Sequence, residues 1–140
     1  MIDLIIAVIL GAILFHAFYK LSNSGSLPFI IELKIGYFSK KLLLKEDDSI
    51  YLKRGICFSI IGRRFIYKQK DSAALVYLEK ALSDFNNAVQ INHKNSNALL
   101  QKGLLLLLMN RPIEAYESLT EAENLGDKKA TKIIIENGMR

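Results

Sequence analysis

The sequence predicts an all-α protein in which an N-terminal transmembrane helix is followed by a short array of helix-turn-helix repeats. An uninterrupted apolar run, Leu4 to Leu14, stands near the N-terminus. Further along, two segments match at an offset of 34 residues, which aligns Ala81 with Ala115. A period of 34 residues is typical of helix-turn-helix repeats. No segment between turn signals alternates apolar and polar residues over the length of a strand, so we expect no sheet.

Size and composition allow one small domain and one targeting element. The chain has 140 residues, of which 51% are hydrophobic and 24% charged, and its net charge is +5. The positive excess lies in residues 20–70, which hold eleven Lys or Arg and four Asp or Glu. No nucleic-acid recognition motif accompanies this charge, so we expect no nucleic-acid partner. Cys57 is the only cysteine, which rules out an internal disulfide and fits a reducing compartment.

Residues 1–20 are predicted to be a transmembrane anchor. As a helix, residues 2–19 would be about 27 Å long, close to the roughly 30 Å thickness of the hydrocarbon core. No Lys or Arg precedes the apolar run and residues 18–20 are a poor cleavage site, which favours an uncleaved single-pass anchor over a signal peptide. The basic residues that follow predict a cytoplasmic C-terminal domain. A cleaved signal peptide, and therefore a secreted or periplasmic module, is the alternative.

Residues 21–45 are predicted to be a polar linker followed by an amphipathic helix over 27–44. Ser26 is a suitable N-cap for this helix, and Ile30, Leu33 and Tyr37 share one of its faces. Basic flanks and an apolar face are typical of a helix that lies on a bilayer surface. The other reading is that this face covers the core of the repeat domain. A second membrane span is not expected, because two charged residues, at 32 and 34, lie inside the segment.

Capping and turn signals divide residues 46–140 into five further helices. We expect them over 49–67, 71–91, 99–109, 113–125 and 127–138. Acidic residues from Glu46 to Asp48 favour a helix start through the helix dipole. Pro112 marks the start of a helix, and Gly126 is a C-terminal stop.

Corresponding residues recur in the two halves of this helical region. In the second helix of each pair, Ala81, Phe85 and Ala88 fall on Ala115, Leu119 and Ala122 at one constant offset. In the first helix, Tyr51, Gly55 and Phe58 recur in pattern as Leu99, Gly103 and Leu106. This pattern resembles the tetratricopeptide repeat family, whose motif is Trp-x2-Leu-Gly-x2-Tyr followed by Ala-x3-Phe and a further Ala. The resemblance covers residues 48–137, with copies at about 48–95 and 96–129 and a capping helix at 127–138.

The first copy departs from the family pattern in length. Gly55 and Ala81 are 26 positions apart, whereas Gly103 and Ala115 are 12 positions apart. The difference of 14 positions predicts about two extra turns on each of the first two helices. Two copies rarely bury a continuous core alone, so the terminal helix, residues 28–45 or a partner is expected to cover them.

Single residues also depart from the family pattern. Arg54 and Lys102 stand where the family prefers Leu, and His93 and Asp127 stand where it prefers Pro. The resemblance nevertheless implies a ligand-binding groove lined by the first helix of each pair. The implied partner-binding residues are Leu52, Ile56, Ile60, Asn97, Leu100, Leu104, Leu107 and Leu108. Such an apolar groove suits an apolar helix of a partner, and the alternative is that residues 104–108 belong to the core.

A basic patch lies in the inserted residues of the first copy. It consists of Arg63, Arg64, Lys68 and Lys70. The patch is either a solvated face or a contact for lipid headgroups or for an acidic partner.

No arrangement of residues predicts catalysis, a cofactor or a metal site. His93 stands in a turn without a second histidine, and no nucleophile–base set or phosphate-binding glycine loop is present. We therefore expect a non-enzymatic, membrane-anchored adaptor that binds other proteins. Its partner would be an apolar helix or a subunit of a membrane complex, in which this chain is a small assembly or structural subunit. Membrane contact is expected through residues 2–19 and, on one of the two readings above, through residues 27–45.

Overall fold

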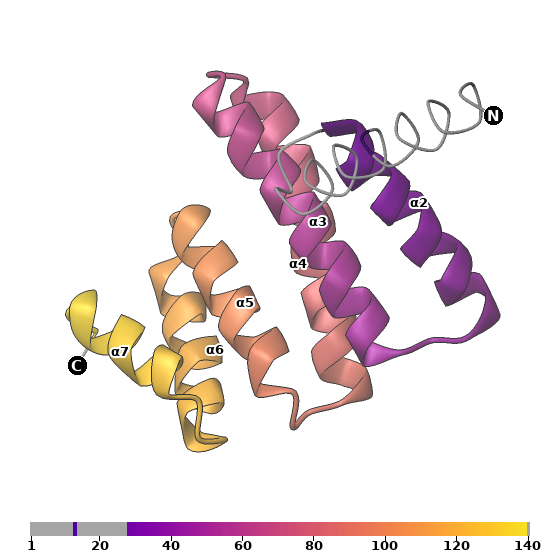
Figure 1. The fold of residues 1–140 in the computed structure, drawn as a ribbon. Helices are drawn as coiled ribbons and strands as arrows, with labels where there is room; N and C mark the ends of the chain where they lie inside the picture. Colours follow the sequence, from indigo (N-terminus) through magenta and orange to yellow (C-terminus); the bar gives the residue numbers. More distant parts are fainter. Residues whose placement is uncertain (1–12, 14–27, 140) are drawn as a thin grey trace, which may run out of the picture. The chain divides into compact units, whose positions relative to one another are not determined.

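A computed structural model describes residue 13 and residues 28–139, and every regular element in this part of the chain is an α-helix (Figure 1). The helices are α2 (Pro28–Leu44), α3 (Asp48–Tyr67), α4 (Asp71–Ile91), α5 (Ser96–Leu108), α6 (Pro112–Asn124) and α7 (Lys128–Glu136). The all-α prediction is confirmed for the described residues. The chain forms two compact units, residues 1–33 and 34–140, and the boundary between them falls inside α2.

The predicted anchor lies outside the described residues except for Ile13, which is helical and exposed. Among residues 13 and 28–139, no helix has the length and apolar character needed to cross a bilayer. The first unit also contains the start of α2, where Ile30 and Ile31 are buried and Phe29 and Leu33 are exposed. The single-pass anchor and the cytoplasmic position of the C-terminal domain stay predictions.

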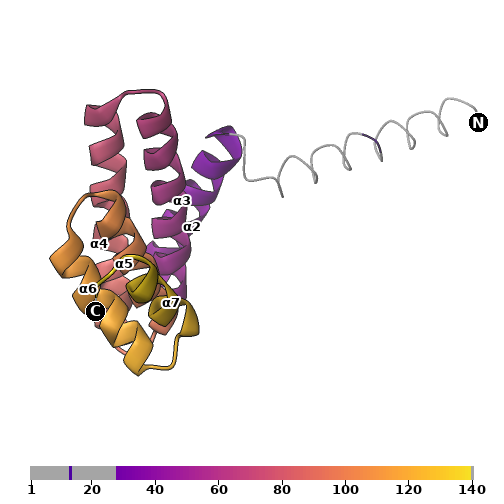
Figure 2. The ribbon, with the colours of Figure 1, turned by 90° about the vertical axis from the view of Figure 1, so that its left-hand side faces the viewer.

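The second unit is a stack of helical hairpins. Helices α3 and α4 form one antiparallel hairpin, α5 and α6 form the next, and α7 packs on α6 (Figures 1 and 2). Helix α4 also packs on α5, so each helix from α3 to α6 contacts its successor in the chain. Two apolar clusters hold the stack together, one joining α3, α4, α5 and Ala115 of α6 and the other joining α5, α6 and α7.

Three junctions between helices reverse the chain with the same backbone turn. Gln69, Asn110 and Gly126 have φ values of 54°, 58° and 88°, in the left-handed region that commonly ends a helix. In each junction a backbone N–H donates to the carbonyl five residues earlier. These donor–acceptor pairs are Lys70–Phe65, Arg111–Leu106 and Asp127–Ala122, at 2.9, 2.9 and 3.0 Å. The repeated turn gives successive helices the same antiparallel connection.

Each hairpin is closed by a glycine that lies against a bulky residue of the facing helix. A Cβ atom added to Gly55 would lie 2.7 Å from Cε1 of Phe85, and one added to Gly103 would lie 2.6 Å from Cγ of Leu119. Only glycine leaves room for so close an approach, because any larger side chain would occupy the space of the facing ring or isobutyl group. The positions predicted to be equivalent from the sequence pattern therefore make equivalent contacts.

The first hairpin repeats this closure nearer its turn. A Cβ atom added to Gly62 would lie 2.6 Å from Cδ2 of Leu78, and Gly62 precedes Ala74 by the same interval that separates Gly103 from Ala115. Helices α3 and α4 have 20 and 21 residues, whereas α5 and α6 have 13 each. The two extra turns per helix expected from the sequence are present, and the α3–α4 turn extends beyond the α5–α6 turn (Figures 1 and 2).

The terminal helix covers the second hairpin. Ala130 and Ile134 of α7 are fully buried, in one cluster with Leu119 and Ala122 of α6. Asp127 starts α7 as an N-cap, since its carboxylate accepts hydrogen bonds from the N–H groups of the second and third residues that follow it. The terminal helix is therefore one of the elements that cover the apolar core of the two-copy array, as expected from the sequence.

Replacement by alanine should have opposite effects at an open glycine, Gly36, and at a closely packed one, Gly103. Gly36 lies inside α2 with no heavy atom within 4 Å of an added Cβ, so Gly36→Ala should raise the free energy of unfolding by up to about 1 kcal/mol through helix propensity. At Gly103 the added methyl group overlaps Leu119 and approaches the Ala115 carbonyl oxygen to 3.3 Å. Overpacking costs about 1–3 kcal/mol, so Gly103→Ala should lower the free energy of unfolding. Thermal unfolding of both variants checks the difference in sign, and a stabilised Gly103→Ala would contradict the close approach.

Candidate interaction surface

A buried ion pair joins the first hairpin across its two helices. Nε and Nη2 of Arg54 in α3 donate to the two carboxylate oxygens of Asp84 in α4, at 2.8 and 2.7 Å. The Asp84 side chain is 3% exposed and that of Arg54 is 20% exposed. The third nitrogen, Nη1, donates to Oγ of Ser39 in α2 at 3.1 Å. The hydrogen bond with Asp84 raises the pKa of Arg54 above its usual value, so the guanidinium stays charged.

Aromatic rings surround the same guanidinium group. Its central carbon lies 5.5 Å from the ring centroid of Tyr51 and 5.9 Å from that of Phe58, distances at which a cation is attracted to the ring face. The repeat pattern marks Arg54 only as a departure from the family's Leu. The signal that could have revealed its role is Asp84, an acid on the apolar face of α4 beside Phe85, because an acid in such a position needs a partner.

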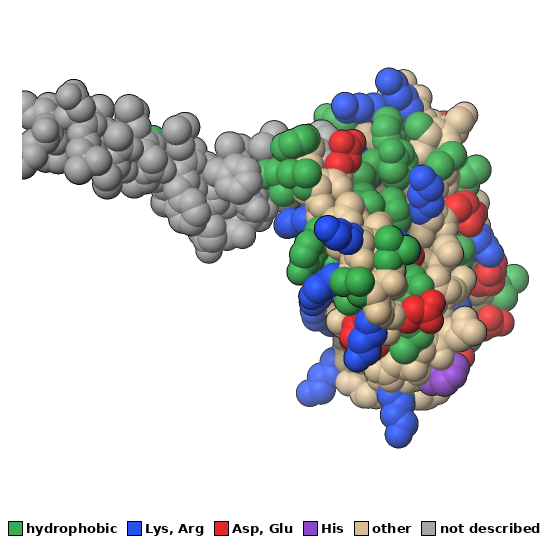
Figure 3. Space-filling view, turned by 90° about the vertical axis from the view of Figure 1, so that its right-hand side faces the viewer, with side chains coloured by type: hydrophobic (Ala, Val, Ile, Leu, Met, Phe, Trp, Pro, Cys, Tyr) green, Lys and Arg blue, Asp and Glu red, His purple; other side chains and the backbone are tan. Residues whose placement is uncertain are grey.

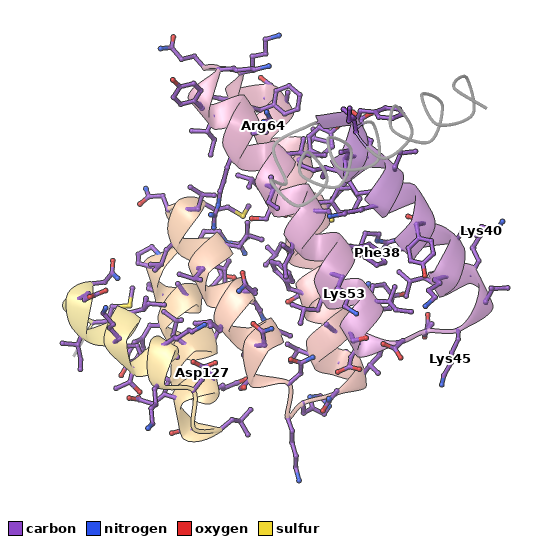
Figure 4. All side chains as sticks on the ribbon, in the orientation of Figure 1. Phe38, Lys40, Lys45, Lys53, Arg64 and Asp127 are labelled. Atoms are coloured by element: carbon purple, nitrogen blue, oxygen red, sulfur yellow. The ribbon has the colours of Figure 1, made fainter. Side chains whose placement is uncertain are left out.

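Helix α2 contacts the repeat helices through its second part. Beyond the Ser39 hydrogen bond, Phe38 is half-buried on the side of α2 that faces α3 (Figure 4). Tyr37, Leu43 and Leu44, in contrast, are exposed by 56%, 87% and 83%. The hypothesis that α2 covers the repeat helices is therefore supported by a contact, the hydrogen bond between Arg54 and Ser39. The hypothesis that α2 lies on a bilayer stays a prediction.

The residues of the implied groove divide between core and surface. Leu107 contacts both apolar clusters, so residues 104–108 belong partly to the core and partly to an accessible face. Asn97 and Leu100 also border a shallow depression near the start of α7, which Asp127 and Lys128 help to line. Of the eight predicted groove residues, two are buried, Leu52 and Leu100. Four are half-buried, namely Ile56, Ile60, Leu104 and Leu107. The other two are exposed, Leu108 by 38% and Asn97.

The predicted basic patch lies at the far end of the first hairpin, which we call the hairpin tip and define as residues 63–76. Arg63, Lys68 and Lys70 are exposed and Arg64 is half-buried. Figure 4 labels Arg64 near the end of α3, and Figure 3 shows Lys and Arg side chains gathered at the upper end of the molecule, where the α3–α4 turn lies in Figure 1. Within the described residues, the buried Nη1 atom of Arg64 has no hydrogen-bond partner. The structure thus brings the four predicted cations together.

Four exposed apolar side chains share the hairpin tip with these cations. Ile66, Tyr67, Leu75 and Val76 are exposed by 37%, 90%, 54% and 53%. Ile66 and Leu75 border a shallow depression of about 250 Å³ whose other lining residues are Asp71, Ala74, Leu78 and Met109. The sequence signal for this surface is the second Gly–Ala interval of the first hairpin, because it makes the first hairpin longer than the second, which contributes only Met109 to the lining of this depression.

The remaining candidate reactive groups have little access to solvent or no neighbours suited to chemistry. Cys57 is buried, and burial raises the pKa of its thiol, which makes it a poor nucleophile at neutral pH. His93 is exposed in the turn before α5. Among the described residues, no group of three or more His, Cys, Asp or Glu side chains is placed to hold a metal ion.

The sequence matches no protein-family model and no curated protein. The resemblance to tetratricopeptide repeats therefore depends on the motif residues of this chain.

Proposed function

We propose that this chain is a membrane-anchored, non-enzymatic adaptor that binds another protein through its hairpin stack, as a small assembly or structural subunit of a membrane complex. The proposal combines two parts. Residues 2–19 have the composition and length of a single-pass anchor, and the motif residues resemble tetratricopeptide repeats, whose members bind protein segments.

The observation that carries the partner claim is the repeated Gly–bulky closure of the two hairpins. Because Gly55 faces Phe85 as Gly103 faces Leu119, the two first helices, α3 and α5, hold corresponding places in a stack. An apolar helix of a partner would complete the burial of the side chains that these helices leave half covered. Those side chains are Ile56 and Ile60 on α3, and Leu104, Leu107 and Leu108 on α5.

The test is affinity purification of the full chain from detergent-solubilised membranes, followed by mass spectrometry of the proteins that accompany it. Leu108→Glu places a charge on the exposed part of the α5 face and should reduce the recovered partner at least tenfold, the loss expected for a contact worth about 1.4 kcal/mol. The matched control is Ile135→Glu on α7, where the side chain is 59% exposed. It should leave the recovery unchanged.

Two results would contradict the proposal. One is a chain that purifies without any stoichiometric companion, and the other is a partner that stays equally bound to Leu108→Glu. The melting temperature of each variant is measured in parallel, so that a loss of binding is separated from a loss of folding.

A further inference from the structure

The hairpin tip carries exposed apolar side chains that take no part in closing α3 against α4. Gly62 and Leu78 already close α3 against α4 at the base of this segment. Beyond them, Tyr67 stands 90% exposed at the end of α3, and Leu75 and Val76 are each more than half exposed on α4. Exposed apolar groups clustered in this way generally mark a surface that meets another molecule.

The charge of the same segment is strongly one-sided. The hairpin tip contains four Lys or Arg and a single acid, Asp71. Arg63, Lys68 and Lys70 are exposed, and no ion pair of the described residues involves any of the four cations. An anionic surface is therefore the complementary partner.

Within the second unit, the hairpin tip extends beyond the neighbouring hairpin. The α3–α4 turn extends past the α5–α6 turn in both views (Figures 1 and 2), and the two extra turns of helix correspond to about 10 Å. The second hairpin therefore does not block the end of the first one from contact with a plane.

We propose that the hairpin tip inserts its apolar side chains into the headgroup region of an anionic lipid bilayer. Tyrosine is favoured at that depth because its ring is apolar and its hydroxyl is polar. Lys and Arg side chains can extend from the same helix ends to lipid phosphates, and each adds affinity for an anionic leaflet. By turning outward, Arg64 would gain in a phosphate the acceptor that its Nη1 atom lacks. The inference rests on the membrane location in the proposed function, and it gives the adaptor a second point of attachment.

A bilayer suits this surface better than a folded protein partner. Of the exposed apolar residues at this hairpin end, Ile66 and Leu75 line a shallow depression, whereas protein partners are usually bound by anchor residues in well-packed pockets. A lipid interface adapts to a projecting end, and it supplies both the apolar phase and the negative charge that the tip matches.

The absence of tryptophan from the sequence allows a single-site optical test on the full chain. The Tyr67→Trp variant is purified in detergent and added to vesicles of phosphatidylcholine alone or of phosphatidylcholine with a minor share of phosphatidylglycerol. We expect the emission of this tryptophan to shift to shorter wavelength, and to be quenched by brominated acyl chains, only with the anionic vesicles. The control reporter is Ile135→Trp on α7, at an exposed site of the terminal helix, whose emission should not change.

A matched pair of charge variants tests the role of the cations. In the Tyr67→Trp background, Lys68→Gln with Lys70→Gln removes two charges from the tip, while Lys128→Gln with Lys129→Gln removes two from α7. Each juxtamembrane cation contributes about fivefold in partitioning, so the first pair should raise the anionic-lipid content needed for half-maximal shift, and the second should leave it unchanged. A shift insensitive to the first pair would overturn the proposal.

Flotation of the same vesicles separates failure of the tip from failure of the anchor. A chain that floats with both kinds of vesicle while the emission of the tryptophan at position 67 stays unshifted overturns the tip contact and leaves the anchor intact. A chain that floats with neither overturns both. A shift that appears only after a purified protein partner is added assigns the tip to protein binding and overturns the lipid proposal.

Discussion

Replacing Phe85 by alanine is expected to lower the free energy of unfolding by about 3–5 kcal/mol, the loss typical of a fully buried ring. The Phe85 side chain is 1% exposed, and it fills the space left open by Gly55 in the facing helix. Its removal leaves a cavity in the apolar cluster that joins α3 to α6. Chemical unfolding of the full chain in mild detergent, followed by circular dichroism, measures the change.

Two control variants make this result specific. Phe85→Leu gives the first hairpin the glycine–leucine pair that Gly103 and Leu119 form in the second, and it should cost clearly less than Phe85→Ala because it removes fewer buried atoms and leaves a smaller cavity. Leu75→Ala removes an apolar side chain that is 54% exposed, and should change stability by no more than about 0.5 kcal/mol. If Phe85→Ala is no more harmful than Leu75→Ala, the hairpin is not closed by this contact.

The second large effect is expected at the ion pair. Arg54→Met leaves the Asp84 carboxylate buried and without its bidentate partner, and loss of one member of a buried pair typically costs about 3–5 kcal/mol. The same change also removes the hydrogen bond from Nη1 to Ser39, so the attachment of α2 should weaken. Hydrogen exchange of the α2 amides reports that weakening separately from global unfolding.

The double variant Arg54→Met with Asp84→Leu separates the two reasons why Arg54 can matter. If the single variant fails because a charge is left buried, replacing both groups by apolar side chains should restore most of the lost stability. The faster exchange of α2 should persist in the double variant, because Ser39 still lacks its donor. A double variant as unstable as the sum of the single ones would mean that the pair has no coupling.

Much of the architecture could be predicted from the sequence because the determining contacts are made by residue types with few substitutes. Gly55 and Gly103 can be recognised as equivalent from their neighbours, and both allow close approach of a facing bulky residue. The Gly55–Ala81 interval predicts the length of the first hairpin. Turn signals at Pro112 and Gly126 place the helix boundaries within a few residues of those observed.

Other features could not be predicted, because they depend on pairings that the repeat pattern does not record. Arg54 is visible in the sequence only as an unusual residue, since its partner Asp84 lies 30 positions away on the facing helix. The exposed apolar side chains of the hairpin tip, Tyr67 above all, are indicated only indirectly, by the second Gly–Ala interval that lengthens the first hairpin. Helical periodicity indicates which residues share a face, but not whether another helix is long enough to cover it.

The two glycine closures in the first hairpin have a consequence for how this protein can vary in evolution. Gly55 and Phe85 are 30 positions apart and Gly62 and Leu78 are 16 positions apart, so moving from one closure to the next changes the loop between them by 14 positions. Insertions or deletions of that size, split equally between α3 and α4, would keep a glycine against a bulky residue and leave the junction with α5 undisturbed. The reach of the hairpin can therefore change by whole heptads in each helix, whereas a change of about two residues in each helix, roughly half a turn, would turn its apolar stripe away from the core.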